Sequence, residues 1–408
     1  MVVPLERKPS TTKHKENKLK LITMKTQLAI INDMLSALLL AIGAPRFGGT
    51  GGSRAASKKS PVSTHAFNTL AAPLAAFVIS LAAATPARAT DVFLIASYHE
   101  KDACGQPQYK AAMDALRQSG FANLSSKGYF LDTRVTAKED VLKAVEQIRK
   151  DIRAAKPKLV FTIDDPAFAM LYEEVLQHPG TQMVFSGLNR KLSYYNDKAR
   201  FLSNRTPVAN ITGVFEYLFM REQFGMLESI LKRPVNKVAV LYSTDVVGVI
   251  LKDQILDEMK GTPYEDRILV FAAEDIPTMI RHAKTINDDK QIDAYIPVTM
   301  SVLDPADNKR KTMDLVAPTL IKNIHKIDLS LNSSFTEYGF FGGVSIDFYQ
   351  MGFQTGFVAT KLLKGGAIKD IPIEDAKRSI IAVNRKRIQE LGIRLSPEAR
   401  SIVDKWID

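Results

Sequence analysis

The sequence predicts an α/β fold in which parallel strands alternate with helices. Short, nearly uninterrupted apolar segments are typical of strands covered by helices on both faces of a sheet. Each segment leads into a few polar residues and then into a helix. The segments are Val92–Ala96, Leu159–Ile163, Met183–Phe185, Val238–Leu241 and Ala294–Ile296. Because ligands bind at the carboxyl ends of the strands in open α/β sheets, these polar residues are the predicted site.

The distribution of charge argues against a nucleic-acid partner. The 408 residues carry a formal net charge of +11, but residues 1–89 hold 12 Lys or Arg and 3 acidic residues. From residue 90 onward there are 43 basic and 41 acidic side chains. The part that is predicted to fold is therefore nearly neutral and does not have the strongly basic composition of nucleic-acid-binding domains.

Cysteine and histidine do not have the pattern of a disulfide or metal site. Cys104 is the only cysteine, so neither an internal disulfide nor a Cys-x-x-Cys metal site is possible. His178, His282 and His325 are scattered without ligand spacing. We therefore expect no metal and no cofactor, and Cys104 is expected to be a partly buried small side chain rather than a nucleophile.

Residues 1–89 are predicted to be a basic, disordered tail followed by a signal peptide. Leu70–Ala84 is apolar, with a lysine pair upstream and Ala87-Arg88-Ala89 immediately downstream. This order matches a basic region, an apolar core and a small-x-small cleavage site. Cleavage is predicted after Ala89, which indicates a periplasmic mature chain. The alternative is an uncleaved anchor, for which the apolar core is short.

The first half of the mature chain is expected to contain three helices. Thr136 and Glu139 have the spacing of a capping box at the start of a helix. Asp165-Pro166 is expected to open another helix, because proline is favoured in the first turn. The other elements of this half are a helix over Gln108–Gln118, a strand at Tyr129–Leu131 and an extended segment at residues 211–214.

A second alternating series follows a long polar segment, residues 190–210. Two successive series of similar size predict two lobes. Gly352 and Gly356 in the last long helix would permit close helix packing, and the chain is expected to cross between the lobes again there. The elements of this part are helices over Met220–Leu231, Val247–Met259, Pro277–Asn287, Met313–Ile324 and Tyr349–Leu363, and strands at Ile268–Phe271, Leu329–Leu331 and Ile380–Val383.

Segments from both ends of the mature chain carry a resemblance. The C-terminal pattern consists, in order, of Gly343-Val344, Asp347, Gly352, Gly356, Leu363-Lys364-Gly365, Ile371-Pro372-Ile373, Asn384 and Leu391-Gly392-Ile393. The N-terminal segments are Ser97-Tyr98-His99, residues 164–168, residues 184–189 and residues 210–214. The C-terminal pattern resembles the signature of a known family, the substrate-binding proteins of ABC transporters of the tryptophan/tyrosine-type group and related uncharacterised uptake systems, and the N-terminal segments resemble one branch of it.

The resemblance implies a type I periplasmic-binding-protein fold, with two open parallel-sheet α/β lobes joined by three crossovers and closing on a small ligand. It also implies delivery of the ligand to an ABC permease driven by its ATPase. We expect a monomer in which lobe 1 comprises residues 90–211 and 335–366. Lobe 2 is expected to comprise residues 212–334 and 367–408.

The predicted ligand-binding residues follow the strands of both lobes, together with one tyrosine that is expected either to stack on a ligand or to pack in the core or hinge. They are Ser97, Tyr98, Asp164, Asp165, Ser186, Gly187, Asn189, Tyr242, Ser243, Thr244, Thr299 and Tyr338. Ser243 and Thr244 precede a helix whose free N–H groups suit an anion, unless Asp245 caps that helix. We predict no catalytic residue.

Asp164-Asp165 is the most distinctive of these positions. Amino-acid binders of the group carry small hydroxyl residues there, so this chain departs from the family pattern, and an aromatic amino-acid ligand is not implied. Adjacent side chains at a strand end point in opposite directions. One carboxylate is therefore expected to receive a cationic amine or hydroxyl groups. The alternative for Asp165 is a cap on the following helix.

The sequence thus predicts an extracytoplasmic solute-binding protein of an ABC importer that captures a small polar molecule, an amino acid or a related compound. A ligand-sensing periplasmic partner of a membrane receptor or sensor kinase is the alternative. A hydrolase using Ser97 or Asp164 is a weaker hypothesis, because no Gly-x-Ser-x-Gly nucleophile motif is present.

Overall fold

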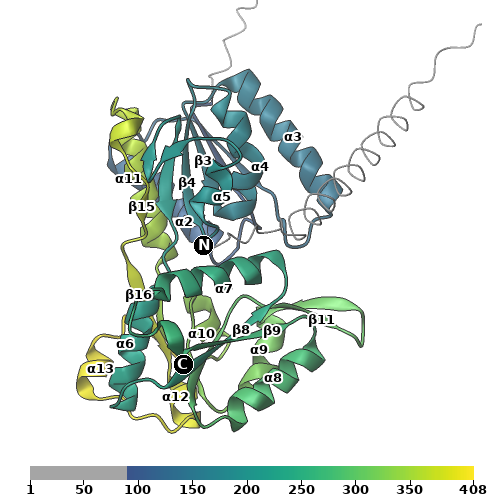
Figure 1. The fold of residues 1–408 in the computed structure, drawn as a ribbon. Helices are drawn as coiled ribbons and strands as arrows, with labels where there is room; N and C mark the ends of the chain where they lie inside the picture. The colour runs from purple at the N-terminus through teal and green to yellow at the C-terminus, as the bar shows by residue number, and fades with distance from the viewer. Residues whose placement is uncertain (1–89) are drawn as a thin grey trace, which may run out of the picture. The chain divides into compact units, whose positions relative to one another are not determined.

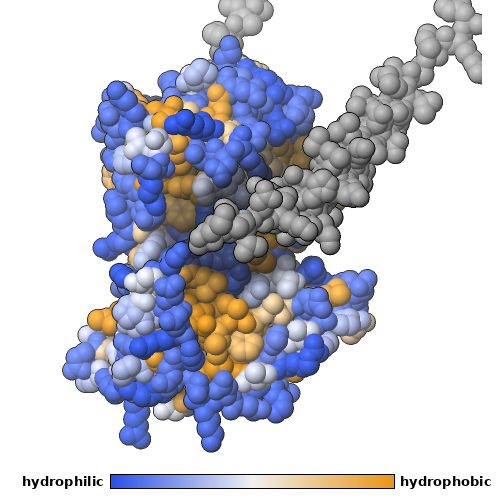
Figure 2. Space-filling model, in the orientation of Figure 1, coloured by the Kyte–Doolittle hydropathy of each residue, from blue (hydrophilic) through white to orange (hydrophobic). Residues whose placement is uncertain are grey.

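The computed structural model describes residues 90–408, which belong to one compact unit. The predicted tail, signal peptide and cleavage position lie outside these residues. Within residues 90–408, no helix is long and apolar enough to cross a membrane. In Figure 2 much of the visible surface is hydrophilic, with an apolar area on the second lobe.

A six-stranded parallel sheet forms the first lobe (Figure 1). Its strands lie in the order β15-β7-β4-β3-β1-β2. β1 and β3 are completely buried, as their apolar sequences predict. The strands are β1 (Val92–Ala96), β2 (Ser126–Phe130), β3 (Leu159–Ile163), β4 (Gln182–Leu188), β7 (Ile211–Phe215) and β15 (Glu374–Asp375).

Helices cover both faces of this sheet. Phe93 and Ile95 of β1 pack in one core with residues of α3 and α4, whereas Val92 and Leu94 pack in the other core with residues of α2 and α11. This alternation follows from the two-residue period of a strand. The helices are α2 (Gly105–Gln118), α3 (Lys138–Ala155), α4 (Asp164–Leu176), α5 (Leu192–Asn196) and α11 (Phe348–Leu363).

Two glycines set the contact between α11 and α2, which are far apart in the sequence. A Cβ atom on Gly352 would lie 2.4 Å from the backbone oxygen of Gln108, and one on Gly356 would lie 2.6 Å from that of Ala112. Neither distance is possible for a real Cβ, so only glycine permits this approach. α11 is thereby held on the first lobe.

The second lobe contains a four-stranded parallel sheet in the order β13-β10-β8-β9 and a three-stranded sheet in the order β14-β16-β17. Single bridges from Leu329 to Gly342 and from Asn332 to Ile346 connect the two. The strands are β8 (Lys237–Ser243), β9 (Ile268–Ala273), β10 (Ile292–Pro297), β13 (Ile327–Asp328), β14 (Gly342–Ile346), β16 (Ser379–Asn384) and β17 (Lys405–Ile407).

Seven helices and two hairpins complete the described residues. The helices are α6 (Met220–Leu231), α7 (Val246–Met259), α8 (Ile276–Asp288), α9 (Met313–Asn323), α10 (Ser333–Glu337), α12 (Arg385–Glu390) and α13 (Pro397–Ser401). Short 3-10 turns cover Glu265–Arg267 and Ile368–Asp370. The hairpins are β5 (Leu202–Ser203) with β6 (Thr206–Pro207) and β11 (Ser301–Asp304) with β12 (Lys309–Thr312).

The chain passes between the lobes three times. It leaves the first lobe after β7, returns between β14 and α11, and leaves again between β15 and β16. The strand pairing differs from the predicted lobe boundaries. Residues 212–215 and 374–375 pair within the first sheet, and β14 pairs with β16 of the second lobe.

Two local predictions are wrong. The capping box at Thr136 does not form, because Thr136 closes a turn with its N–H bonded to the carbonyl of Asp132, and α3 begins two residues later without a side-chain cap. The strand predicted at Leu329–Leu331 lies earlier in the chain, at β13. The last residue of β13, Asp328, is buried and paired with Arg387, and an apolar sequence pattern does not indicate a buried ion pair.

Candidate ligand-binding site

Two adjoining cavities lie between the lobes. The inner chamber has a volume of about 60 Å³, and the outer cavity has a volume of about 620 Å³. Residues of both lobes line both cavities, as expected for a site that holds a ligand between two lobes. The residues shared by the two cavities are Tyr98, Cys104, Arg134, Val247, Thr299, Asn332 and Phe335.

Asp164 lines the inner chamber from the end of β3. It is the first residue of α4 and has a φ of 65°, a left-handed conformation that is uncommon outside glycine and is tolerated best by Asp and Asn. Its side chain accepts one hydrogen bond, from Gln108 Nε2 to Oδ1 at 3.3 Å. The other oxygen, Oδ2, is buried and has no hydrogen-bond partner. Burial, reinforced by the charge of Asp102, raises the pKa of the Asp164 carboxyl to about 8.

Glu216 supplies a second carboxyl to the same chamber. It follows β7 directly, and it is 5% exposed. Burial, with the nearby Asp164 charge, raises the pKa of Glu216 well above its usual range. Asn189 hydrogen-bonds this carboxyl and also donates from Nδ2 to Gln254 Oε1 at 3.0 Å. Two carboxyls thus line one small chamber.

Arg134 is the one Lys or Arg among the described residues that line the inner chamber. It follows β2, and its Nη1 donates to Asp102 Oδ2 at 2.6 Å. The guanidinium carbon lies 3.8 Å from the centre of the Tyr98 ring, the arrangement of a cation–π contact. Asp102 and Tyr98 together hold this cation on the wall shared by the two cavities.

The second lobe closes the chamber with mainly apolar side chains. Val247 and Leu251 come from α7, and Phe335 comes from α10. Asn332 contributes a polar edge, with its Nδ2 3.0 Å from Cys104 Sγ across the cleft and its Oδ1 accepting from the backbone of Ser334 at 2.9 Å. An apolar wall opposite two carboxyls favours a ligand with one polar end.

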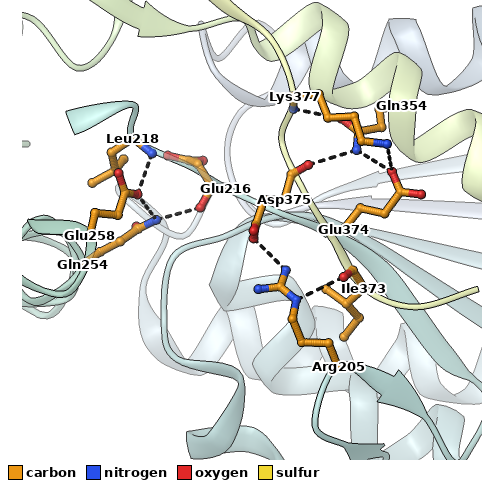
Figure 3. A network of polar contacts seen from close by, with 10 residues as sticks. All are labelled: Arg205, Glu216, Leu218, Gln254, Glu258, Gln354, Ile373, Glu374, Asp375 and Lys377. Carbon is orange, nitrogen blue, oxygen red and sulfur yellow. Dashed lines mark hydrogen bonds and ion pairs between the residues drawn. The ribbon is translucent and has the colours of Figure 1, made fainter. Parts of the chain in front are cut away.

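The first and third crossings run side by side, because β7 and β15 pair (Figure 3). Glu258 accepts from the backbone N–H of Leu218 at 2.7 Å, and Gln254 Nε2 donates to the backbone oxygen of Glu216 at 2.7 Å. Burial raises the pKa of Glu258 to about 7. Side chains of α7 therefore fix the crossing that carries Glu216.

The third crossing is held from the first lobe. Arg205 donates to the backbone oxygen of Ile373 at 3.1 Å and to Asp375 Oδ1 at 2.6 Å. On α11, Gln354 Nε2 donates to Glu374 Oε2 at 2.9 Å and to the backbone oxygen of Asp375 at 3.0 Å. These bonds end where the chain enters the second lobe, so bending between the lobes is confined to short segments.

Five of the twelve predicted ligand-binding residues line the cavities. Tyr98 and Thr299 line both, Asp164 and Asn189 line the inner chamber, and Tyr338 lines the outer cavity. These five come from both lobes, so the structure brings them to one cleft.

The predicted residues Ser97, Ser186 and Gly187 lie behind the cleft. Ser97 is completely buried; its Oγ lies 2.6 Å from the carbonyl of Ile163 and accepts from the backbone of Ala167 at 2.9 Å. Ser186 Oγ lies 2.6 Å from Gln108 Oε1, which orients the amide that bonds Asp164. A Cβ on Gly187 would lie 2.8 Å from Asp164 Oδ1. All three thus position Asp164 rather than line the cavity.

Asp165 faces away from the chamber, as the opposite directions of adjacent side chains predict. It accepts from the backbone of Asn189 at 2.9 Å, from the backbone of Arg190 at 3.2 Å and from Tyr195 Oη at 2.7 Å. The alternative of a helix cap is wrong, because α4 starts at Asp164 and no side chain caps it. Asp165 instead fixes the loop after β4.

The predicted group at the end of β8 does not line either cavity. Ser243 Oγ donates to the backbone oxygen of Thr299 at 2.9 Å and also contacts Asp245. Asp245 caps α7, accepting from Val247 N at 3.0 Å and Gly248 N at 3.3 Å. The N–H groups proposed for an anion are therefore occupied. Tyr242 and Thr244 lie on the same strand end, outside both linings.

Arg134, Glu216 and Asn332 line the inner chamber with nitrogen- or oxygen-bearing side chains and were not predicted. Arg134 and Glu216 follow β2 and β7, so the rule that polar residues after strands line the cleft would have found them. β2 was not among the apolar segments because its sequence, Ser-Lys-Gly-Tyr-Phe, is largely polar. Asn332 follows the extended residues 329–331 and lies at the start of α10.

Two α/β lobes with parallel sheets, crossed three times by the chain, are the type I periplasmic-binding-protein fold. Solved structures with this chain's fold include the ABC domain in complex with L-Trp from Streptococcus pneumonia, at 18% identity and a TM-score of 0.55, covering 78% of this chain and all of that one. A ligand-free, open substrate binding protein with adhesive properties from Clostridium difficile has 16% identity and a TM-score of 0.58 over 78% of this chain and 99% of that one.

Sequence comparison gives a match over part of the chain. Residues 321–403 match the family described as ABC transporter substrate binding protein, which confirms the predicted resemblance. The chain is also similar to a tyrosine-binding protein of Clostridioides difficile (strain R20291), with 21% identity over 299 residues, 69% of this chain and 78% of the relative. Among the described residues, no group of three or more His, Cys, Asp or Glu is placed to hold a metal ion.

Proposed function

We propose that this chain is the periplasmic solute-binding component of an ABC importer. It captures a small polar molecule between its two lobes and delivers it to a membrane permease driven by its ATPase. Binding is non-covalent, the chain acts as a monomer, and the cleft closes by bending at the crossings.

The observation that carries this proposal is the unpaired Asp164 Oδ2. A carboxyl oxygen that is buried without a partner is costly, and native proteins rarely retain one without a function. Asp164 lines a chamber between the lobes in a backbone conformation that is uncommon outside glycine. A ligand polar group placed in the chamber would satisfy it.

Hydrolysis is a poor fit to the same residues. Ser97, the hydroxyl suggested as a nucleophile, is fully buried and outside both cavity linings. It holds the first turn of α4 through the backbone of Ala167. Its geometry supports a positioning role for this hydroxyl, in keeping with a protein that binds and releases its ligand unchanged.

The test has two arms. In the first arm, protein purified from the periplasm of the organism that produces it is examined by native mass spectrometry. A thermal-shift screen then covers amines, amino acids, nucleosides, sugars and organic acids, because a ligand that binds only the native state raises the melting temperature of the protein. Deletion of the gene is then expected to abolish uptake of the ligand found. If the deletion leaves uptake intact but removes a transcriptional response to that ligand, the protein is a sensor partner instead.

A further inference from the structure

Resting on that proposed function, we propose that the ligand is an organic amine without an α-carboxylate, with its ammonium group held between Asp164 and Glu216. The family resemblance does not identify the ligand of this chain. Asp164-Asp165 follows the third strand, where amino-acid binders of the group carry small hydroxyl residues. The inner chamber itself supplies the evidence for the chemical class.

The charges that line the chamber are unbalanced in favour of a cation. Asp164 and Glu216 are both 5% exposed, and neither forms an ion pair among the described residues. Arg134, the one cation of the lining, is bonded to Asp102. An ammonium group between two buried carboxylates forms charge-assisted hydrogen bonds and neutralises charge that the protein leaves uncompensated. The raised pKa of each carboxyl is the expected sign of that missing cation.

The donors beside the inner chamber that suit a carboxylate are already used, and Lys101 lines only the outer cavity. Arg134 donates to Asp102, and the first-turn N–H groups of α7 donate to Asp245. At α10, the backbone N–H of Ser334 donates to Asn332. In an α-amino acid the carboxylate is attached to the carbon that bears the ammonium group. It would therefore enter the chamber beside Asp164 and Glu216, where like charges repel.

The size and walls of the chamber describe the rest of the ligand. A volume of about 60 Å³ has room for only a few water-sized groups, so it fits an ammonium group with its first methylene. Leu218, Leu251 and Phe348 form apolar walls beside the carboxyls. The outer cavity adds Tyr338 and shares Phe335 with the chamber, and these rings suit an aliphatic or aromatic body.

The experiment compares three compounds that share one body: 2-phenylethylamine, phenylalanine and 3-phenylpropanoate. Isothermal titration is performed on the wild type, Asp164→Asn, Glu216→Gln and a control, Asp140→Asn, in which an exposed carboxylate of α3 outside both cavity linings is changed. Butylamine and 1,4-diaminobutane test aliphatic bodies. Circular dichroism and thermal melts confirm that each variant is folded.

We expect an amine to bind the wild type at least about 100-fold more tightly than the matching amino acid, and the acid without an amine not to bind. Either carboxamide variant is expected to lose about 10-fold or more in affinity for the amine, whereas Asp140→Asn changes it less than about threefold. If Asp164→Asn does not fold, Glu216→Gln carries the same test.

Tighter binding of phenylalanine than of the amine overturns the inference. Equal binding of a neutral analogue such as 2-phenylethanol does so as well. If only nucleosides, sugars or organic acids stabilise the protein in the thermal-shift screen, the amine inference fails and the proposed function stands. If no small molecule binds in either assay, both fail.

Discussion

Asp164 in the first lobe and Asp328 in the second are both buried carboxylates, yet the protein treats them in opposite ways. Asp328 Oδ2 accepts from Arg387 Nε at 2.9 Å and from Nη2 at 2.6 Å, and its Oδ1 accepts from the backbone N–H of Phe341. Asp164 has one bond from a neutral amide and one oxygen without a partner. The second lobe therefore supplies a cation to its buried carboxylate from its own Arg387, whereas the first lobe supplies none to Asp164.

The pKa values of the two carboxyls differ in the same sense. Burial raises the pKa of Asp328 to about 6, with the Arg387 charge opposing the shift. Burial raises the pKa of Asp164 to about 8, because Gln108 and the more distant Arg134 oppose it less. A buried carboxylate with its own cation is part of the scaffold, and one without a cation is a candidate for ligand contact.

The largest expected effect is at the paired carboxylate. Arg387→Met leaves Asp328 buried and without its cation, so the free energy of unfolding is expected to fall by about 3–5 kcal/mol. Urea denaturation measures this change. The double variant Asp328→Asn/Arg387→Met removes both charges and is expected to recover more than half of the loss. A single variant within about 1 kcal/mol of the wild type would contradict the assignment of this pair as scaffold.

The next effect concerns the pH dependence of stability without ligand. Asp164 has a higher pKa in the native state than in the unfolded state, so between about pH 4 and 8 the native protein binds more protons and its stability falls as pH rises. One group with such a shift changes the free energy of unfolding by up to about 1.4 kcal/mol per pH unit. Urea denaturation at pH 5, 7 and 9 measures this dependence. The free energy of unfolding of Asp164→Asn is expected to fall less between these pH values than that of the wild type. A slope identical to that of Asp140→Asn would refute this.

Amine binding is expected to depend on pH in the opposite direction. The carboxylate form of Asp164 binds the cation, so affinity should rise by up to about tenfold per pH unit up to pH 8. Asp102, Asp165 and Glu216 oppose ionisation of Asp164, and Arg134 favours it. Titration calorimetry in two buffers of different ionisation enthalpy measures the proton released. Affinity independent of pH between 6 and 8 would show that Asp164 is already ionised.

The smallest effect is expected at an exposed ion pair between the lobes. Lys191 Nζ lies 2.7 Å from Asp257 Oδ2, with the two side chains 63% and 42% exposed. Solvent screens such a pair, so Lys191→Ala is expected to change the free energy of unfolding by less than about 1 kcal/mol. Denaturation and amine titration check this together. A large loss of affinity would mean that this pair, rather than the buried carboxyls, controls closure.

The fold was predictable where burial dictates the sequence. β1, β3 and α6 have the predicted bounds, because their apolar residues follow the period of the strand or the helix. The β11–β12 hairpin was not predicted, since its strands pair with each other and, apart from one bridge between Leu303 and Asp275, with no other strand, and the second reads Lys-Arg-Lys-Thr. Such an exposed hairpin carries no apolar period.

The candidate site was predictable at Asp164 and only partly elsewhere. The position of polar residues after buried strands indicated Tyr98, Asn189 and Thr299 as well. The same rule does not distinguish Asp164 from Asp165, because the partners of Asp165 lie in a loop that the chain reaches 24 and 25 residues later. Ser97 and Ser186 are of the right type for ligand contact, but their hydroxyls are used one layer behind the cleft.

The tight contact of α11 on α2 has a consequence for the order of folding. The first lobe lacks a helix and an edge strand until residues 348–375 have been synthesised, after the elements from α6 to β14 of the second lobe. Until then the α2 surface that receives Gly352 and Gly356 is without its partner, and the missing contacts are distant in sequence, which slows folding. The lobe that is made first is therefore the one that waits longest to be complete.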